Sequence, residues 1–175
     1  MGYGTRRVGA HEWRALREIR LEALRDTPIG FGERYQSALT HPERFWRERA
    51  QRGAEACDTA MFVALDGDGR FVGTAGVYTD AQAAPGEQSV IYSVYVSPGH
   101  RGAARGVASA LFDAVVAWAR GAGAAVITLS VHEDNRRALA FYRRYGFVAT
   151  GEKRPYTLDE TASLILMRYP ISAEG

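Results

Sequence analysis

The sequence predicts a single domain of mixed α/β architecture, with helices packed on the faces of a central sheet. Two amphipathic helical segments open the chain, a hairpin with a strong turn signal follows, and strands then alternate with helices. The 175 residues are enough for one domain with its own core. A content of 46% hydrophobic and 24% charged residues is typical of a globular protein.

The N-terminal part is expected to be helical. Apolar side chains from Trp13 to Leu24 recur at helical spacing between arginines, which predicts a helix over residues 11–24. The Thr-Pro-Ile-Gly run at 27–30 breaks that helix. A proline at its first turn opens a second predicted helix over residues 42–50.

Three strands are expected next. Residues 61–65 and 71–78 flank an Asp-Gly-Asp-Gly sequence at 66–69, which is a strong hairpin signal. The third strand, residues 89–97, is rich in β-branched and aromatic side chains. These strands should therefore form an antiparallel part of the sheet.

The remaining elements alternate in type. A Gly-, Ala- and Arg-rich loop precedes a predicted helix with an apolar stripe, and a strand, a helix and two strands follow. The predicted ranges are 98–105 for the loop, 106–120 and 135–145 for the helices, and 125–131, 147–150 and 164–169 for the strands.

Composition excludes several classes of function. A net charge of +2 does not indicate a nucleic-acid partner, and no stretch approaches the roughly 20 apolar residues that span a membrane. The first ten residues lack the apolar run of a secretory signal, so we expect a cytoplasmic protein. The single cysteine, Cys57, excludes an internal disulfide and a thiol-based metal cluster. Its sequence context favours a thiol without a catalytic role.

Charge is distributed unevenly along the chain. Residues 53–100 carry 1 basic and 6 acidic side chains, whereas residues 101–175 carry 10 basic and 7 acidic ones. A basic segment suits a polyphosphate ligand, and an acidic segment suits a cationic one.

The most informative stretch is the loop between the third strand and the long helix, Val96 to Leu111. The N-terminus of a helix offers free N–H groups and a partial positive charge, and small residues let a phosphate approach them. Arg101 and Arg105 add cationic side chains. The lysine of a P-loop and the Gly-x-Gly-x-x-Gly of a dinucleotide loop are both absent. From spacing alone, an ordinary strand–loop–helix turn is an equal alternative.

The stretch resembles the acetyl-CoA signature of the GNAT acetyltransferase superfamily, in particular a bacterial branch. In that signature, Val-x-Pro is followed by Arg/Gln-x-x-Gly-x-Gly/Ala at the start of a helix. Here the Arg/Gln position falls on Ala103 when counted back from Gly106, and on Arg101 when counted forward from Pro98. The loop is thus two residues longer than usual, and either Arg101 or Arg105 is left as the pyrophosphate contact.

A second motif lies at the expected distance. Residues 135–147, Asn-Arg-Arg-Ala-Leu-Ala-Phe-Tyr-Arg-Arg-Tyr-Gly-Phe, are similar to the family's Asn-x-x-Ala-x-x-(Phe/Leu)-Tyr-x-x-x-Gly-Phe. The bland alternative is a helix of core aromatics with an asparagine cap. The ordered pair of motifs is much more specific than either one, and weaker similarity extends over the N-terminal helices.

The resemblance implies a mostly antiparallel mixed sheet with splayed central strands and acetyl-CoA as cosubstrate. An acetyl group would pass directly to a primary amine in a ternary complex. Tyr142 is the expected acid for the leaving thiolate, and Glu87 is one candidate base. The implied cofactor-binding residues are Val94, Tyr95, Val96, Arg101, Gly102, Ala103, Ala104, Arg105, Gly106, Val107, Ala108, Ser109, Asn135 and Tyr142.

The base and the acceptor stay open. Related sequences often carry Glu near the start of the central strand, where this chain has Val90. Asp80 and His132 are alternatives to Glu87, and a mechanism without a dedicated base is another. Candidate acceptor-site residues, chosen as aromatics beside a carboxylate that would suit a cationic amine, are Phe31, Glu33, Tyr35, Tyr78 and Tyr156.

The acceptor, the type of function and the oligomeric state have alternatives. The acceptor is a polyamine, an amino acid, an antibiotic amine or a protein N-terminus, and the sequence does not choose among them. A catalytically weak module that binds acetyl-CoA is the main rival to an enzyme, and a nucleotide-binding protein is the second. A homodimer is an expectation from the family, in which dimers are common. No metal is expected.

Overall fold

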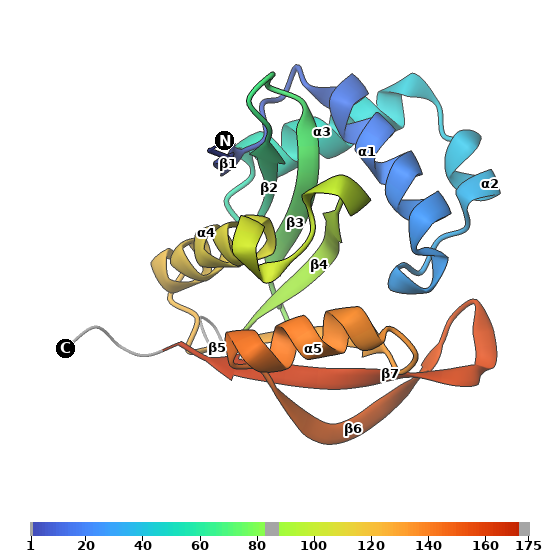
Figure 1. Cartoon of the computed structure of the whole chain (residues 1–175), viewed down its shortest axis with the longest axis vertical. Helices are drawn as coiled ribbons and strands as arrows, with labels where there is room; N and C mark the ends of the chain where they lie inside the picture. The colour runs from blue at the N-terminus through green and yellow to red at the C-terminus, as the bar shows by residue number, and fades with distance from the viewer. Residues whose placement is uncertain (1, 83–87, 172–175) are drawn as a thin grey trace.

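A computed structural model describes residues 2–82 and 88–171 (Figure 1). Seven strands form one sheet in the order β1-β2-β3-β4-β5-β7-β6. The strands are β1 (Gly4–Arg7), β2 (Thr59–Leu65), β3 (Phe71–Thr79), β4 (Gln88–Val96), β5 (Val126–His132), β6 (Val148–Tyr156) and β7 (Asp159–Pro170). The α-helices are α1 (Trp13–Asp26), α2 (Tyr35–Leu39), α3 (Glu43–Glu55), α4 (Val107–Gly121) and α5 (Arg136–Tyr145).

Strand β2 shows why helices cover both faces of the sheet. Successive side chains of a strand point to opposite faces. Met61 and Val63 pack in one cluster with Trp13 of α1 and Trp46 of α3. The alternate residues of β2, Ala60 and Ala64, pack in another cluster with Val107, Leu111 and Val115 of α4. The strand is therefore apolar along most of its length instead of alternating.

The sheet is mostly antiparallel, as the resemblance implies. All neighbouring strands pair antiparallel except β4 and β5. Within the described residues, that parallel pair is registered over residues 88–90 and 126–128. Beyond Val90 the two strands diverge, which confirms the expected splay at the centre of the sheet and leaves room for a ligand.

Strand β4 carries a bulge just where it faces this gap. Thr74 pairs with Tyr95 and Gly76 with Tyr92. Between these two pairs β4 has two residues, whereas β3 has one. Ser93 lies in the bulge with φ of 53°, in the left-handed region that side chains seldom adopt. Its carbonyl accepts a hydrogen bond from Thr74 Oγ1 at 2.9 Å.

Four elements differ from the sequence-based expectation. Strand β1 and helix α2 were not predicted: Gly-Thr-Arg-Arg has no apolar alternation, and α2 has only five residues. Strand β7 is longer than predicted, the end of β6 was not predicted, and the two strands form one hairpin. The side chains of β6 are exposed from Val148 to Pro155, so burial leaves no periodic signal in its sequence.

Among the residues that the structure describes, no helix combines the length and the apolar character needed to cross a lipid bilayer.

Candidate functional site

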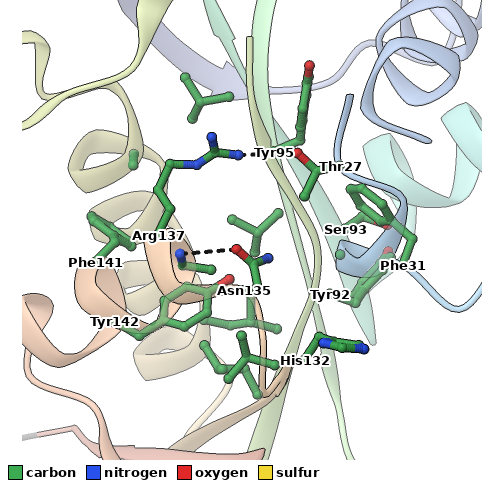
Figure 2. Close-up of a pocket in the computed structure, with 18 of the residues that line it drawn as sticks. Thr27, Phe31, Tyr92, Ser93, Tyr95, His132, Asn135, Arg137, Phe141 and Tyr142 are labelled. Carbon is green, nitrogen blue, oxygen red and sulfur yellow. Dashed lines mark hydrogen bonds between the residues drawn. The ribbon is translucent and has the colours of Figure 1, made fainter. Parts of the chain in front are cut away.

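A cavity of about 870 Å³ opens where β4 and β5 diverge (Figure 2). Its wall includes the start of α4, the face of α5, the end of α1 and the short 3-10 turn Pro28–Gly30. Figure 2 shows Asn135, Phe141 and Tyr142 on one side of the cavity and Phe31 and Ser93 on the other. The cavity thus has one end at the loop before α4 and another beneath α1 and α3.

The loop end presents backbone donors. Gly102 and Gly106 have φ of 109° and 68°, conformations that glycine adopts without strain. The first intrahelical bond of α4 runs from Ala110 N to Gly106 O, and no side chain caps the helix. The N–H groups of the first helical turn therefore have no intrahelical partner; those of Ala108 and Ser109, which line the cavity, are left for a ligand, and the helix dipole makes this end partly positive.

The loop before α4 contains two 3-10 turns, Pro98–His100 and Ala103–Arg105. Arg105 turns away from the cavity, and its Nη1 donates to the hydroxyl of Tyr3 at 3.2 Å. That hydroxyl also lies 3.1 Å from His100 Nδ1. The extended loop is therefore fastened to the segment that leads into β1.

Arg101 has the opposite orientation and lines the cavity. Its Nε donates to the carbonyl of Val96 at 2.7 Å, and its guanidinium pairs with Asp26 at the end of α1. Burial tends to raise the pKa of Asp26, but hydrogen bonds from Arg101 and Thr27 hold it below its ordinary value. Of the two candidate arginines, only Arg101 is positioned at the cavity.

The end of β4 directs backbone groups into the gap. The amide of Ser97 donates to Val72 O at 2.9 Å, so Ser97 faces β3. Since N–H and C=O groups alternate sides along an antiparallel strand, those of Val96 point toward β5, where the strands have separated. Val94, two residues back, lies in the bulge of β4, where this alternation does not apply. Both residues line the cavity.

Helix α5 supplies the facing side chains. Asn135 caps it, with its side-chain oxygen 3.3 Å from the amide of Ala138. Tyr142 is 7% exposed and its hydroxyl points into the cavity toward Asn135 (Figure 2). Burial raises the pKa of Tyr142 above its ordinary range, so the phenol keeps its proton. Arg137 reaches across the cavity and donates to Thr27 Oγ1 at 3.2 Å.

Most of the cofactor residues predicted from sequence meet in this one cavity. Those that line it are Val94, Tyr95, Val96, Arg101, Gly102, Ala103, Gly106, Ala108, Ser109, Asn135 and Tyr142. Ala104, Arg105 and Val107 do not line it, and the Val107 side chain is buried under α4 instead. Glu87 lies outside the described residues.

The other candidate bases are positioned poorly for that role. Asp80 does not line the cavity, and its carboxylate accepts from Gln82 N and Gln88 Nε2. His132 does line it, but its Nδ1 accepts the amide N–H of Asp134 at 3.1 Å. The neutral ring must then carry its proton on Nε2, so the basic nitrogen is already in use.

The acceptor candidates divide into two groups. Phe31 and Tyr156 line the cavity, and the Tyr156 hydroxyl donates to Phe31 O at 2.6 Å. Glu33, Tyr35 and Tyr78 do not line it. Glu33 instead accepts from Arg20 at 3.1 Å and pairs with His41 at 2.5 Å.

Sequence reasoning identified Arg101 but missed the other basic residues of the wall. Five arginines line the cavity, and no Asp or Glu among the described residues does; the five are Arg20, Arg49, Arg101, Arg137 and Arg144. Arg20 and Arg49 belong to helices distant from both motifs, and the chain is rich in arginine, so composition gave no signal. The helical spacing of Arg20 and Arg49 places them on the buried faces of their helices. That spacing is equally typical of residues that only pack in the core.

Comparison with known proteins places these features in a family. The sequence profile of the Acetyltransferase (GNAT) family matches residues 13–147. The chain is 35% identical over 97 residues to a streptothricin acetyltransferase of Streptomyces lavendulae, a match covering 55% of this chain and 49% of that protein. It is 34% identical over 107 residues to the N-alpha-acetyltransferase RimI of Mycobacterium tuberculosis, covering 61% of this chain and 64% of that one.

The chain thus spans about half of the length of the first of these relatives and less than two thirds of the second. Among solved structures, the fold is similar to a phosphinothricin acetyltransferase of Sinorhizobium meliloti in complex with acetyl-CoA. The TM-score is 0.78 at 21% identity, over 98% of this chain and 90% of that one. At this identity the likeness establishes a shared fold.

Proposed function

The chain belongs to the acetyltransferase (GNAT) family, and from this premise we propose that it transfers an acetyl group from acetyl-CoA to a primary amine. The transfer is direct, with both substrates bound in one cavity. The names of two relatives, a streptothricin acetyltransferase and an N-alpha-acetyltransferase, support an amine acceptor that is a small molecule or a peptide.

The cavity fits coenzyme A at its loop end. The pyrophosphate requires several converging donors, and the unpaired amides of the first turn of α4 supply them. A Cβ built on Gly106 would meet no atom within 4 Å, so the space in front of these amides is open. Arg101 adds a positive charge beside it. The pantetheine arm would then run along Val94 and Val96 in the gap between the strands.

The transferred acetyl group comes from the thioester of acetyl-CoA. A backbone N–H of the β4 end, directed into the gap, is suited to stabilise the oxyanion that develops on the acetyl carbonyl. Tyr142 can donate its proton to the departing thiolate, because burial keeps the phenol protonated at neutral pH. Both groups belong to rigid elements, which keeps them oriented.

The attacking amine must be neutral, and no described carboxylate of the cavity is available to deprotonate it. The arginines of the wall offer a partial substitute. Nearby positive charges disfavour a further cation and lower the pKa of a bound ammonium. We propose that the amine loses its proton to water on entering this environment. Glu87 stays a second candidate for the base.

One observation supports this proposal most strongly: the unpaired N-terminal amides of α4 and the buried hydroxyl of Tyr142 face one cavity, at the divergence of β4 and β5. The test is calorimetric titration with acetyl-CoA. We expect micromolar binding by the wild type and loss of about 100-fold or more in Gly106→Glu, which places an anion against the phosphate site.

The matched control is Gly106→Ala. It shares the strain of a side chain at φ of 68° but adds no charge, and we expect a loss of only a few-fold. Equal effects of the two substitutions would locate the cause in backbone strain. Failure of the wild type to bind acetyl-CoA would refute the proposal.

A second candidate function is a binding module that holds acetyl-CoA without efficient transfer. The absence of a carboxylate from the described cavity wall favours it. Release of free CoA thiol, measured with a broad panel of amines, separates the two, since only an enzyme gives amine-dependent release.

A further inference from the structure

The end of the cavity beneath α1 and α3 contains two arginines that converge on one hydroxyl. Arg20 Nη1 lies 3.4 Å from Ser93 Oγ, and Arg49 Nη2 lies 3.0 Å from the same atom. Both arginines line the cavity. Ser93 lies in the left-handed bulge of β4, so a strained backbone position presents the hydroxyl that these guanidinium groups share.

The charges at this end do not balance. Arg20 pairs with Glu33 at 3.1 Å, but Glu33 also pairs with His41. Arg49 has no acidic partner among the described residues. The Nε atoms of both arginines are buried without a hydrogen-bond partner. Among the described residues, the one carboxylate at this end thus pairs with Arg20 and His41, and none pairs with Arg49.

The surroundings make this imbalance costly. Burial lowers the pKa of Arg20, and the positive charge of Arg49 lowers it further. A guanidinium nevertheless stays protonated at neutral pH, so Arg20 keeps its charge where burial penalises it, next to the charge of Arg49. Poorly paired buried charges destabilise a protein, and a site that keeps them is suited to a ligand of opposite sign.

We propose that Arg20 and Arg49 bind an oxyanion of the acceptor, so that the acceptor is an amine that also carries a carboxylate or a similar group. The planar fork of a guanidinium matches the two oxygens of a carboxylate. The inference rests on the proposed function and specifies its substrate class. It reverses the expectation of a purely cationic acceptor, because the carboxylate of Glu33 is already occupied and lies outside the cavity wall.

The walls between the two ends agree with this assignment. Phe31 lies under the guanidinium of Arg20, whose Cζ is 4.6 Å from the ring centroid. Tyr156, which also lines the cavity, is held by its hydrogen bond to Phe31 O. Such aromatic walls accept the carbon skeleton of the acceptor, while a polyamine would place further positive charge beside the two arginines.

The test compares matched acceptors: the twenty common L-amino acids and their primary amides, together with dipeptides and the corresponding dipeptide amides. Acetyl-CoA-dependent thiol release is measured for each, and binding to the CoA-saturated protein is measured by calorimetry. We expect at least one carboxylate to be preferred over its amide by about 10-fold to 100-fold in kcat/KM or affinity. The two groups of probes distinguish a free amino acid from a peptide as the source of the oxyanion.

The variant is Arg49→Gln, with Arg44→Gln as the control, an exposed arginine on the same helix that does not line the cavity. In Arg49→Gln the preference for the carboxylate should fall toward unity while the affinity for acetyl-CoA stays within a few-fold. Arg44→Gln should retain the wild-type preference. If Arg49→Gln does not fold, the inference is still tested by Arg49→Lys and by the comparison of acids with amides on the wild-type protein.

Two outcomes overturn the inference while leaving the cofactor site intact. One is acetyl-CoA binding with equal or better use of the amides, and the other is acetyl-CoA binding with neither turnover nor binding of any carboxylate. Failure to bind acetyl-CoA overturns the proposed function and the inference together.

Discussion

The two ends of the cavity are built by different means. The loop end consists largely of backbone: two glycines with positive φ, the open first turn of α4 and the edge of β4. The end beneath α1 and α3 consists of side chains from separate elements, above all Arg20, Arg49 and Phe31. On the proposed function, the first end would hold the cosubstrate and the second the acceptor.

The difference also explains what a sequence can reveal. Backbone sites need particular small residues at fixed spacing, so they leave a contiguous motif. Side-chain sites need only that distant residues converge after folding, and they leave none. The predictions below test whether the two ends are as separable as their construction indicates.

The largest effects are expected from the aromatic residues that support each end. Phe112 packs against Phe141, Tyr142 and Phe147 and so joins α4 to α5, whereas Trp46 anchors α3 on the sheet. Each is at most 1% exposed, and replacement by alanine should lower the free energy of unfolding by about 3–5 kcal/mol. Denaturant melts would measure this loss.

The functional consequences should differ between these two variants. Below its melting temperature, Phe112→Ala should weaken acetyl-CoA binding more than it raises the KM of the acceptor. Trp46→Ala should do the opposite, because Arg49 lies one turn further along the same helix. Equal effects on both ligands in both variants would show that the two ends of the cavity do not respond independently to substitution.

The next effect concerns the chemical step. Tyr142→Phe should lower kcat by about 100-fold or more, the usual size of a general-acid contribution, with acetyl-CoA affinity nearly unchanged. Because burial raises the pKa of Tyr142, the wild-type rate should not decline from its ionisation below about pH 10.

The control for this substitution is Tyr145→Phe on the same helix. Its hydroxyl donates to Asp113 Oδ1 at 2.8 Å, and it does not line the cavity. We expect a loss of about 1 kcal/mol of stability and an unchanged kcat. A Tyr142→Phe enzyme with wild-type kcat would remove Tyr142 from the mechanism.

The smallest effect is expected from Glu33→Gln, which releases Arg20 from its only acidic partner among the described residues. Although burial opposes it, hydrogen bonds from His41 and Arg20 hold the pKa of Glu33 below its ordinary value of 4.5. A lowered pKa means that the carboxylate stabilises the fold above about pH 4.5 and that this contribution disappears as the pH falls through the folded pKa.

At pH 7, Glu33→Gln should therefore be less stable by about 1–2 kcal/mol, and the difference should vanish in acid. The same variant should bind a carboxylate-bearing acceptor a few-fold more tightly, since Arg20 is then less neutralised. Glu43→Gln on the exposed face of α3 is the control, with an effect of about 0.5 kcal/mol or less. Weaker acceptor binding in Glu33→Gln would assign Glu33 a direct role in holding the acceptor.

Much of the fold was predictable because its elements carry local signals. The periodicity of Trp13 to Leu24 and the Asp-Gly-Asp-Gly turn at 66–69 both gave elements that the structure contains. Strand β1 was missed because its four polar residues become a strand only by pairing with β2. The length of β6 was missed because the strand exists through its hairpin with β7 and buries almost nothing.

The residues of the candidate site also divide into those with a local sequence signal and those without one. Gly106, Asn135 and Tyr142 were found because each belongs to a contiguous motif, and the structure gathers them in one cavity. The choice between Arg101 and Arg105 needed the two 3-10 turns, which the sequence did not indicate. The role of Arg20 and Arg49 could not be inferred, because nothing in the spacing of α1 and α3 predicts that both reach Ser93.

The short junction between β4 and β5 has a further consequence for the lifetime of the protein. Among the described residues, three pairs join the two halves of the sheet, so a cosubstrate bound in the gap would add contacts that hold them together. Such a ligand at 100 times its Kd adds about 2.7 kcal/mol to the free energy of unfolding. On the proposed function, proteolysis through the open state would then slow as the acetyl-CoA supply rises, and the abundance of the protein would follow the metabolic state that feeds its reaction.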